Sequence, residues 1–183
     1  MKEGLNAFVF ADPEKCIGCR SCEMACFAVH SGNKLTVGCI TSPVMPRLFL
    51  VRTPEATVPI QCRQCDNAPC AKSCPAGIIS EIDGRIIINE EKCIEYQNYI
   101  GCKNCVTACP FGAIDLVPVY VNVETEKQHI KAIKCDLCAG RTEGPACVEV
   151  CPEKALKLVN TTLLKKEKNI AALKSFMNAA GIF

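Results

Sequence analysis

Short apolar stretches along the chain predict short strands. They lie at residues 7–10, 47–52 and 117–123, each followed by polar residues, glycine or proline. Two isoleucine-rich stretches, 78–79 and 86–88, flank Asp83 and Gly84, and apolar residues on both sides of Asp-Gly predict a β-hairpin. Because proline suits the first position of a helix, we expect short helical turns after Pro75, Pro110 and Pro152.

Residues 161–183 follow a different pattern. Lysines separate apolar side chains at helical spacing, and Gly181 near the end suits a helix stop, so we expect one amphipathic helix. Its apolar positions are Leu163, Ile170, Leu173, Met177 and Ala180. An isolated helix of this length is marginal in water, so its apolar face must pack on something. Two interpretations stay open: the helix lies back on its own domain, or it docks on a partner or on neighbouring copies or paralogues of the chain.

Composition argues against a conventional hydrophobic core. The chain has 183 residues, enough for one domain or two very small ones. Its apolar fraction of 49% includes all seventeen cysteines, while aromatic residues make up only 5% and tryptophan is absent. Burial alone stabilises such small units poorly. We therefore expect a covalently bound inorganic core and a largely unfolded apo chain.

Sixteen of the seventeen cysteines form four groups of four, and each group ends in C-x3-C. Three groups continue into proline, at Pro75, Pro110 and Pro152. The groups are Cys16, Cys19, Cys22, Cys26; Cys62, Cys65, Cys70, Cys74; Cys93, Cys102, Cys105, Cys109; and Cys135, Cys138, Cys147, Cys151. Bacterial ferredoxins hold [4Fe–4S] clusters with such runs: three thiolates bind one cluster and the fourth binds its neighbour. The pattern predicts four [4Fe–4S] clusters and an electron-conducting protein.

Two other uses of cysteine fit the pattern less well. The odd count, the regular C-x2-C steps and the absence of a secretory h-region before Cys16 oppose a disulfide framework. Zinc is the stronger rival, but structural zinc sites usually take two separated pairs, not three cysteines followed by C-x3-C-P. The leftover Cys39 is interpreted as a small buried hydrophobe.

The formal net charge of +2 counts cysteines as neutral. A cubane with its four thiolates carries about −2, so four clusters bring the holoprotein to about −6, and a nucleic-acid role has no support. Five basic residues adjoin ligand cysteines and either favour the reduced clusters or lie on the surface: Lys15, Arg20, Arg63, Lys103 and Lys134. His30 and His129 stand in no ligand spacing and are interpreted as structural or solvated.

The gaps between groups predict how they pair. Only eighteen residues, including the predicted hairpin, separate Cys74 from Cys93, so groups two and three form one compact ferredoxin unit and groups one and four another around it. The predicted ligands are Cys16, Cys19, Cys22 and Cys151 for cluster 1; Cys26, Cys135, Cys138 and Cys147 for cluster 2; Cys62, Cys65, Cys70 and Cys109 for cluster 3; and Cys74, Cys93, Cys102 and Cys105 for cluster 4. Each C-x3-C step is expected on a short helix, facing two clusters.

The predicted fold class is therefore α+β, with two bacterial 2[4Fe–4S] ferredoxin-like units, one inserted in the other, plus a C-terminal helix. The outer unit takes residues 1–58 and 128–160, the inserted unit 59–127, and the helix 161–183. No apolar run approaches the ~20 residues of a membrane span, and residues 1–15 hold no twin-arginine signal, so we expect a cytoplasmic protein.

The segments CRQCDNAPCAKSCP (62–75), CKNCVTACPFGAI (102–114) and KCDLC with GPACVEVCPEKAL (134–156) resemble the four-cluster electron-transfer subunits of molybdopterin oxidoreductases and hydrogenases. KCIGCRSCEMAC (15–26) and PRLFLV (46–51) look most like the small subunits of formate hydrogenlyase and hydrogen-dependent carbon dioxide reductase. The resemblance covers about residues 6–160 and implies a non-catalytic relay between a formate dehydrogenase catalytic subunit and a hydrogenase subunit.

Two departures from that family concern groups three and one. Group three reads C-x8-C where this branch more often has C-x2-C, which makes Cys93 the least secure ligand, and group one has Phe27 where the others have proline. No G-x-G-x-x-G, P-loop or catalytic triad occurs, so we find no substrate site. Two other functions stay open: the same role beside a sulfoxide, polysulfide or nitrate reductase, or a scaffold that polymerises through the last helix.

Overall fold

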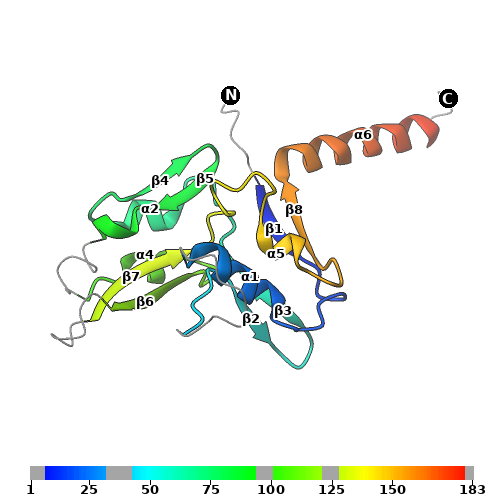
Figure 1. Cartoon of the computed structure of the whole chain (residues 1–183). Coiled ribbons are helices and arrows are strands. Elements are labelled where there is room, and N and C mark those ends of the chain that lie inside the picture. The colour runs from blue at the N-terminus through cyan, green and yellow to red at the C-terminus, as the bar shows by residue number, and fades with distance from the viewer. Residues whose placement is uncertain (1–6, 32–42, 94–100, 121–127, 180–183) are drawn as a thin grey trace.

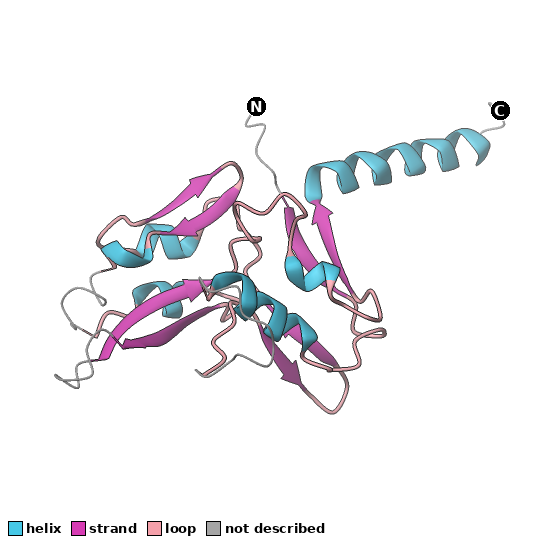
Figure 2. Cartoon of the chain, in the orientation of Figure 1, coloured by secondary structure: helices cyan, strands magenta, loops and turns pink. Residues whose placement is uncertain are grey.

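The computed structural model describes residues 7–31, 43–93, 101–120 and 128–179. Its eight strands form four two-stranded antiparallel sheets, and short helices lie beside them (Figures 1 and 2). Mixed helix and sheet agree with the predicted α+β class. Cys39, the segment 95–100 and Gly181 lie outside the described residues, as does the side chain of His129.

One sheet joins strands from opposite ends of the described chain: β1 (Ala7–Ala11) pairs with β8 (Leu156–Asn160). The other three sheets pair consecutive strands: β2 (Phe49–Arg52) with β3 (Thr57–Ile60), β4 (Ile79–Ile82) with β5 (Arg85–Ile88), and β6 (Ile114–Tyr120) with β7 (Gln128–Lys134). The hairpin predicted at Asp83-Gly84 is confirmed, and both turn residues have positive φ, as a tight hairpin turn requires.

The expected strands at 7–10 and 47–52 are confirmed within two residues, as β1 and β2. The strand expected at 117–123 begins earlier, at Ile114, and residues 121–123 lie outside the described part.

Most helices are short and sit at the cysteine groups. They are α1 (Ser21–His30), α2 (Pro69–Ser73), the 3-10 turn η2 (Glu90–Lys92), α4 (Asn104–Ala108) and α5 (Ala146–Glu149). α1 packs on α5, and α2 packs on α4. Each helix pair therefore brings two cysteine groups together.

The prediction of helical turns after the three prolines was wrong. Helices α2, α4 and α5 precede Pro75, Pro110 and Pro152, and after each proline the chain makes a single turn instead. Each turn is closed by an N–H···O bond back to the ligand cysteine, as from Gly77 to Cys74 at 3.2 Å. The closing residues Gly77, Gly112 and Lys154 have positive φ, and that backbone conformation prevents a right-handed helix from continuing.

The last helix, α6 (Thr161–Ala179), follows β8 directly and projects from the body (Figure 1). The helix is confirmed, but every residue of it except Met177 is exposed, so it does not lie back on its own domain. No described helix combines the length and the apolar character that a bilayer crossing demands.

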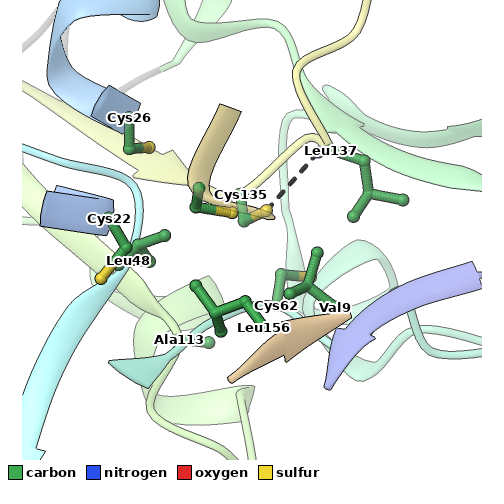
Figure 3. Packing of buried hydrophobic residues seen from close by; sticks show 10 residues of the cluster. Val9, Cys22, Cys26, Leu48, Cys62, Ala113, Cys135, Leu137 and Leu156 are labelled. Carbon is green, nitrogen blue, oxygen red and sulfur yellow. Dashed lines mark hydrogen bonds between the residues drawn. The ribbon is translucent and has the colours of Figure 1, made fainter. Parts of the chain in front are cut away.

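Cysteine side chains form much of the core. One buried group gathers Val9, Leu48 and Leu156 around cysteines of several groups (Figure 3). A second contains Ile79, Ile86 and Ile114 beside Cys70. Leu48 and Val9 are the largest side chains with less than 2% exposure among the described residues, so conventional apolar packing is sparse.

Candidate iron–sulfur sites

Four cysteines from opposite ends of the chain line one cavity. Cys16 and Cys19 precede α1, Cys22 lies in its first turn, and Cys151 follows α5. The pairing of β1 with β8 and the packing of α1 on α5 bring them together. Leu50, Pro59 and Leu156 supply the apolar part of the wall. We call these cysteines tetrad 1.

A second cavity is lined by Cys74, Cys93, Cys102 and Cys105, which we call tetrad 4. Cys74 follows α2, Cys93 follows η2, and Cys105 lies in α4. Cys93, the least secure of the predicted ligands, is buried and faces the same cavity as the other three. Ile78, Ile79, Ile88 and Ala132 complete its apolar wall.

The remaining eight cysteines form two predicted groups, and members of each group interact electrostatically with one another. Tetrad 2 is Cys26, Cys135, Cys138 and Cys147: burial, then the charges of Cys26 and Cys138, raises the pKa of Cys147 to about 12. Tetrad 3 is Cys62, Cys65, Cys70 and Cys109: burial, then Cys62 and Cys109, raises the pKa of Cys65. The eight cysteines of tetrads 1 and 4 line common cavities, and the interactions of Cys147 and Cys65 agree with the predicted grouping of the other eight. Which cysteines bind which cluster stays a prediction.

These surroundings fit a polynuclear cluster. A [4Fe–4S] cluster takes four thiolates, one at each iron, so its ligands surround a volume. The cavities of tetrads 1 and 4 have that form, with four sulfurs and an apolar wall. Within the described ranges, no three His, Cys, Asp or Glu side chains gather into a site for a single metal ion.

Backbone N–H groups point at several of the sulfurs. In both C-x-x-C steps at 62–65 and 135–138, the residue two after the first cysteine has positive φ and donates its N–H to that cysteine: Gln64 to Cys62 Sγ at 3.4 Å, Leu137 to Cys135 Sγ at 3.5 Å (Figure 3). A second repeated bond crosses the Cys-Pro turns, from Ala113 N to Cys109 Sγ at 3.4 Å and from Ala155 N to Cys151 Sγ at 3.3 Å. Hydrogen bonds to the sulfurs raise the reduction potential of a bound cluster.

Comparison with known families agrees with this geometry. The family model described as "4Fe-4S dicluster domain" matches residues 55–161, and one described as "4Fe-4S binding domain" matches residues 9–28. The first match alone covers more than half of the chain. The chain belongs to the 4Fe-4S dicluster domain family.

Relatives of this dicluster protein include electron transport protein HydN of Escherichia coli (strain K12), 40% identical over 170 residues that cover 88% of this chain and 93% of HydN. Formate hydrogenlyase subunit 2 of the same strain is 36% identical over 183 residues, covering 86% of this chain and 84% of the subunit. The longer protein AegA is 41% identical over 160 residues, or 87% of this chain, but the chain spans only 23% of AegA. The resemblance to iron–sulfur subunits of formate-linked complexes is confirmed.

A chain of ion pairs beside tetrad 2 was not predicted from the sequence. His30 donates from Nδ1 to the carbonyl of Cys26 at 2.7 Å and from Nε2 to Asp136 at 3.0 Å. Arg47 joins Asp136 at 3.1 Å to Glu90 at 2.6 Å, and Glu90 also pairs with Lys131 at 2.6 Å. The interpretation of His30 as structural fits these contacts.

The network holds His30 charged. Burial lowers the pKa of His30, but hydrogen bonds to Asp136 and Cys26 outweigh it and raise that pKa to about 10. His30 and Asp136 are 106 residues apart, and neither lies in a motif with the other, so nothing in the sequence pattern could have paired them.

The basic residues beside ligand cysteines differ in burial. Lys15, Arg20 and Lys103 are exposed, which fits the surface interpretation. Arg63 stacks over Phe8 at 5.0 Å and Phe111 at 5.9 Å from the ring centroids. Lys134 is only 3% exposed, so it is not a surface residue.

Proposed function

We propose that the dicluster chain is a non-catalytic electron-transfer subunit with one [4Fe–4S] cluster in each of tetrads 1 to 4. The observation that carries the proposal is that cysteines far apart in sequence, such as Cys16 and Cys151, line common four-sulfur cavities. A bound [4Fe–4S] cluster accepts and returns one electron at a time. The chain itself supplies the thiolates, the N–H donors to sulfur and the apolar walls that exclude water.

We further propose that one ferredoxin unit is inserted in the other. The contacts of α1 with α5 and of β1 with β8 support an outer unit formed by residues 1–58 and 128–160. The contacts of α2 with α4 support an inserted unit at 59–127. In each unit a C-x3-C step, such as Cys22 to Cys26 on α1, contributes one thiolate to each of two tetrads.

The order of electron transfer follows from which tetrads are neighbours. Cys22 of tetrad 1 and Cys26 of tetrad 2 both lie on α1, and Cys70 of tetrad 3 lies on α2 with Cys74 of tetrad 4 directly after it. Cys62 of tetrad 3 and Cys135 of tetrad 2 belong to one buried group, and Gln64 Nε2 donates to the carbonyl of Cys135 at 2.9 Å, which supports tetrads 2 and 3 as neighbours. The proposed order of electron transfer is therefore 1, 2, 3, 4 or its reverse. Cys19 is exposed at one end, and Lys103 and Asn104 are exposed beside tetrad 4 at the other.

The proposed partners are a formate dehydrogenase catalytic subunit and a hydrogenase subunit, since relatives include formate hydrogenlyase subunit 2. Formate oxidation yields carbon dioxide, a proton and two electrons; the two electrons cross the chain singly and reduce two protons to hydrogen, or run the opposite way. We propose that the protein works in the cytoplasm, where reduced thiols allow cluster assembly.

A second role is favoured by α6. Its exposed Leu163, Ile170, Leu173 and Phe176 are apolar surface without cover in the described structure. We propose that α6 docks on other copies or paralogues of the chain within the assembly. In the scaffold alternative this assembly would be the main function, and the clusters would chiefly hold the fold.

Anaerobic iron and sulfide analysis with EPR of the reduced chain tests the proposal. Four cubanes predict about sixteen irons per chain. Reduction by formate with added formate dehydrogenase, and by hydrogen with added hydrogenase, is expected. Co-purification with a sulfoxide, polysulfide or nitrate reductase would instead support the same electron-transfer role beside that reductase. Clusters that take up no electron at biological potentials would leave only the alternative in which the chain is a structural scaffold.

A further inference from the structure

Lys134, the last residue of β7, carries a buried amine between two of the tetrads. It is 3% exposed and directly precedes Cys135 of tetrad 2. Its Nζ donates to the carbonyl of Cys135 at 2.9 Å and to the carbonyl of Ile86 on β5. Across the described part of the chain, no carboxylate lies within ion-pair distance of Nζ, in contrast to Lys131 on the same strand, which pairs with Glu90 at 2.6 Å.

Gln64 completes a bridge around the amine. Its Nε2 donates to the carbonyl of Cys135 at 2.9 Å, and its Oε1 accepts from Ile86 N at 2.8 Å. Gln64 lies between Cys62 and Cys65 of tetrad 3 and is itself buried. Lys134 and Gln64 therefore bind the backbone of the same two residues, Cys135 of tetrad 2 and Ile86 of the hairpin β4–β5, and both donate to the carbonyl of Cys135.

The charge of Lys134 also acts on tetrad 3. Burial and the charge of Cys62 raise the pKa of Cys70, and Lys134 opposes them by lowering it. Lys134 is thus adjacent in sequence to Cys135 of tetrad 2, and its charge also acts on Cys70 of tetrad 3.

A buried ammonium without a carboxylate is unfavourable unless another negative charge offsets it. Two [4Fe–4S] clusters with their thiolates, each about −2, would supply that charge on both sides of Lys134. Each added electron makes a cluster more negative, and a nearby cation stabilises the reduced form more than the oxidised one.

We propose that Lys134 is the shared cation of the two central clusters and raises the reduction potentials of both. This rests on the proposed function, because it requires clusters in tetrads 2 and 3. Electrons must cross between the units at this point in either direction. Without the cation, both central clusters would become harder to reduce, and electron transfer onto them would be less favourable.

The test compares Lys134→Met, Lys134→Gln and Lys134→Arg by EPR-monitored redox titration of the anaerobic holoprotein, with iron counts for each. Lys134→Gln keeps a hydrogen-bond donor but loses the charge. The matched control is Lys131→Met, which removes a lysine of the same strand whose charge Glu90 already offsets. Met and Gln are expected to move two of the four midpoint potentials to more negative values, whereas Arg and the control leave all four near wild type.

Gln64→Glu provides a second measurement in a chain that keeps Lys134. The new carboxylate adds a negative charge beside the amine and is expected to shift the same two potentials to more negative values. If the neutral Lys134 variants do not load iron, the midpoint potentials of Gln64→Glu decide the proposal: two potentials shifted to more negative values support it, and four unchanged potentials overturn it.

Two outcomes overturn the proposal. The first is four unchanged potentials in Lys134→Met and Lys134→Gln with full iron content. The second is a shift in Lys134→Met that Lys134→Gln does not show, because that result would assign the effect to the hydrogen bond and not to the charge. The proposed function fails differently, through a wild-type iron count well below about sixteen.

Discussion

Gly18 and Gly77 both have positive φ, but they differ in the space that a side chain would find. Gly18, in the C-x-x-C step at 16–19, has a φ of +70°. A Cβ there would meet Arg52 Nη2 at 3.0 Å and Thr57 Cγ2 at 3.1 Å, while one at Gly77, with a φ of +61°, would meet nothing within 4 Å. The two glycines share backbone strain but differ in crowding.

Gly18→Ala is therefore expected to destabilise the holoprotein more than Gly77→Ala. The left-handed backbone costs about 1–2 kcal/mol with a Cβ at either site, and Gly18 adds a steric term. The measurement is the denaturant concentration at which the iron–sulfur absorbance is half lost, under anaerobic conditions. Equal losses in the two variants would contradict the close approach of Arg52 to tetrad 1.

Cys93 tests the ligand set at its least regular position. Its spacing to Cys102 departs from the family pattern, yet it is buried in the cavity of tetrad 4. We expect Cys93→Ala to lower the iron count from about sixteen toward about twelve, because one cubane loses a ligand. Cys39→Ala serves as the control and should leave the count unchanged; a full count in both variants would remove Cys93 from the ligand set.

Sequence reasoning reaches residues whose chemistry is local. The C-x-x-C and C-x3-C steps predict candidate ligands because short spacing keeps their sulfurs near each other, as for Cys16, Cys19 and Cys22, which line one cavity. It left two interpretations of Lys134 open, a surface residue or a charge beside the clusters, because the burial of Lys134 depends on Ile86 and Gln64 from other parts of the chain. The bond between His30 and Asp136 was missed for the same reason.

At the scale of elements, the hairpin β4–β5 was predicted, whereas the hairpin β2–β3 and the distant pair β1–β8 were not. Asp83-Gly84 fixes β4 and β5 because the turn itself encodes the pairing. β8 was not expected as a strand; it pairs with β1, and the same two ends of the described chain also meet where α1 packs on α5. The prediction of helices after the prolines was wrong because a residue with positive φ, two positions after each proline, ends the turn.

The helix α6 leads to the prediction at this scale. Leu173 and Phe176 are 57% and 68% exposed. We expect the double variant Leu173→Glu, Phe176→Glu to lower the mass of the native assembly in anaerobic size-exclusion chromatography with light scattering, because two charges would be buried at an apolar contact. The iron count should not change, because α6 contributes no predicted ligand.

Lys168→Glu is the matched control for that variant. It changes the net charge by the same two units as the double variant but alters only a polar, exposed position of α6. Its assembly should keep the wild-type mass. If the double variant and the control behave alike, or if removal of residues 161–183 leaves the mass unchanged, α6 takes no part in assembly.

The whole molecule depends on its sulfur sites for a core. Four two-stranded sheets share no common layer, and large apolar side chains with almost no exposure are few in the described structure. The cysteines themselves occupy the buried centre, as Figure 3 shows for Cys22, Cys26, Cys62 and Cys135. Composition predicted this state, since a chain with 5% aromatic residues has little else to bury.

Removal of iron should therefore unfold the chain. Burial raises the pKa of Cys147 to about 12 and that of Cys22 to about 11, so thiolates at these positions are unfavourable without metal, while free thiols leave the tetrads with no bonds between distant segments. Because cluster binding and folding are one equilibrium, an anaerobic chelator is expected to abolish the strand signal in far-UV circular dichroism as the iron–sulfur absorbance disappears. α6, which contacts little of the body, should fray with it, since a helix of nineteen residues is marginal alone. An iron-free chain that kept its strands and resisted proteolysis would show that apolar packing, not sulfur ligation, holds the fold.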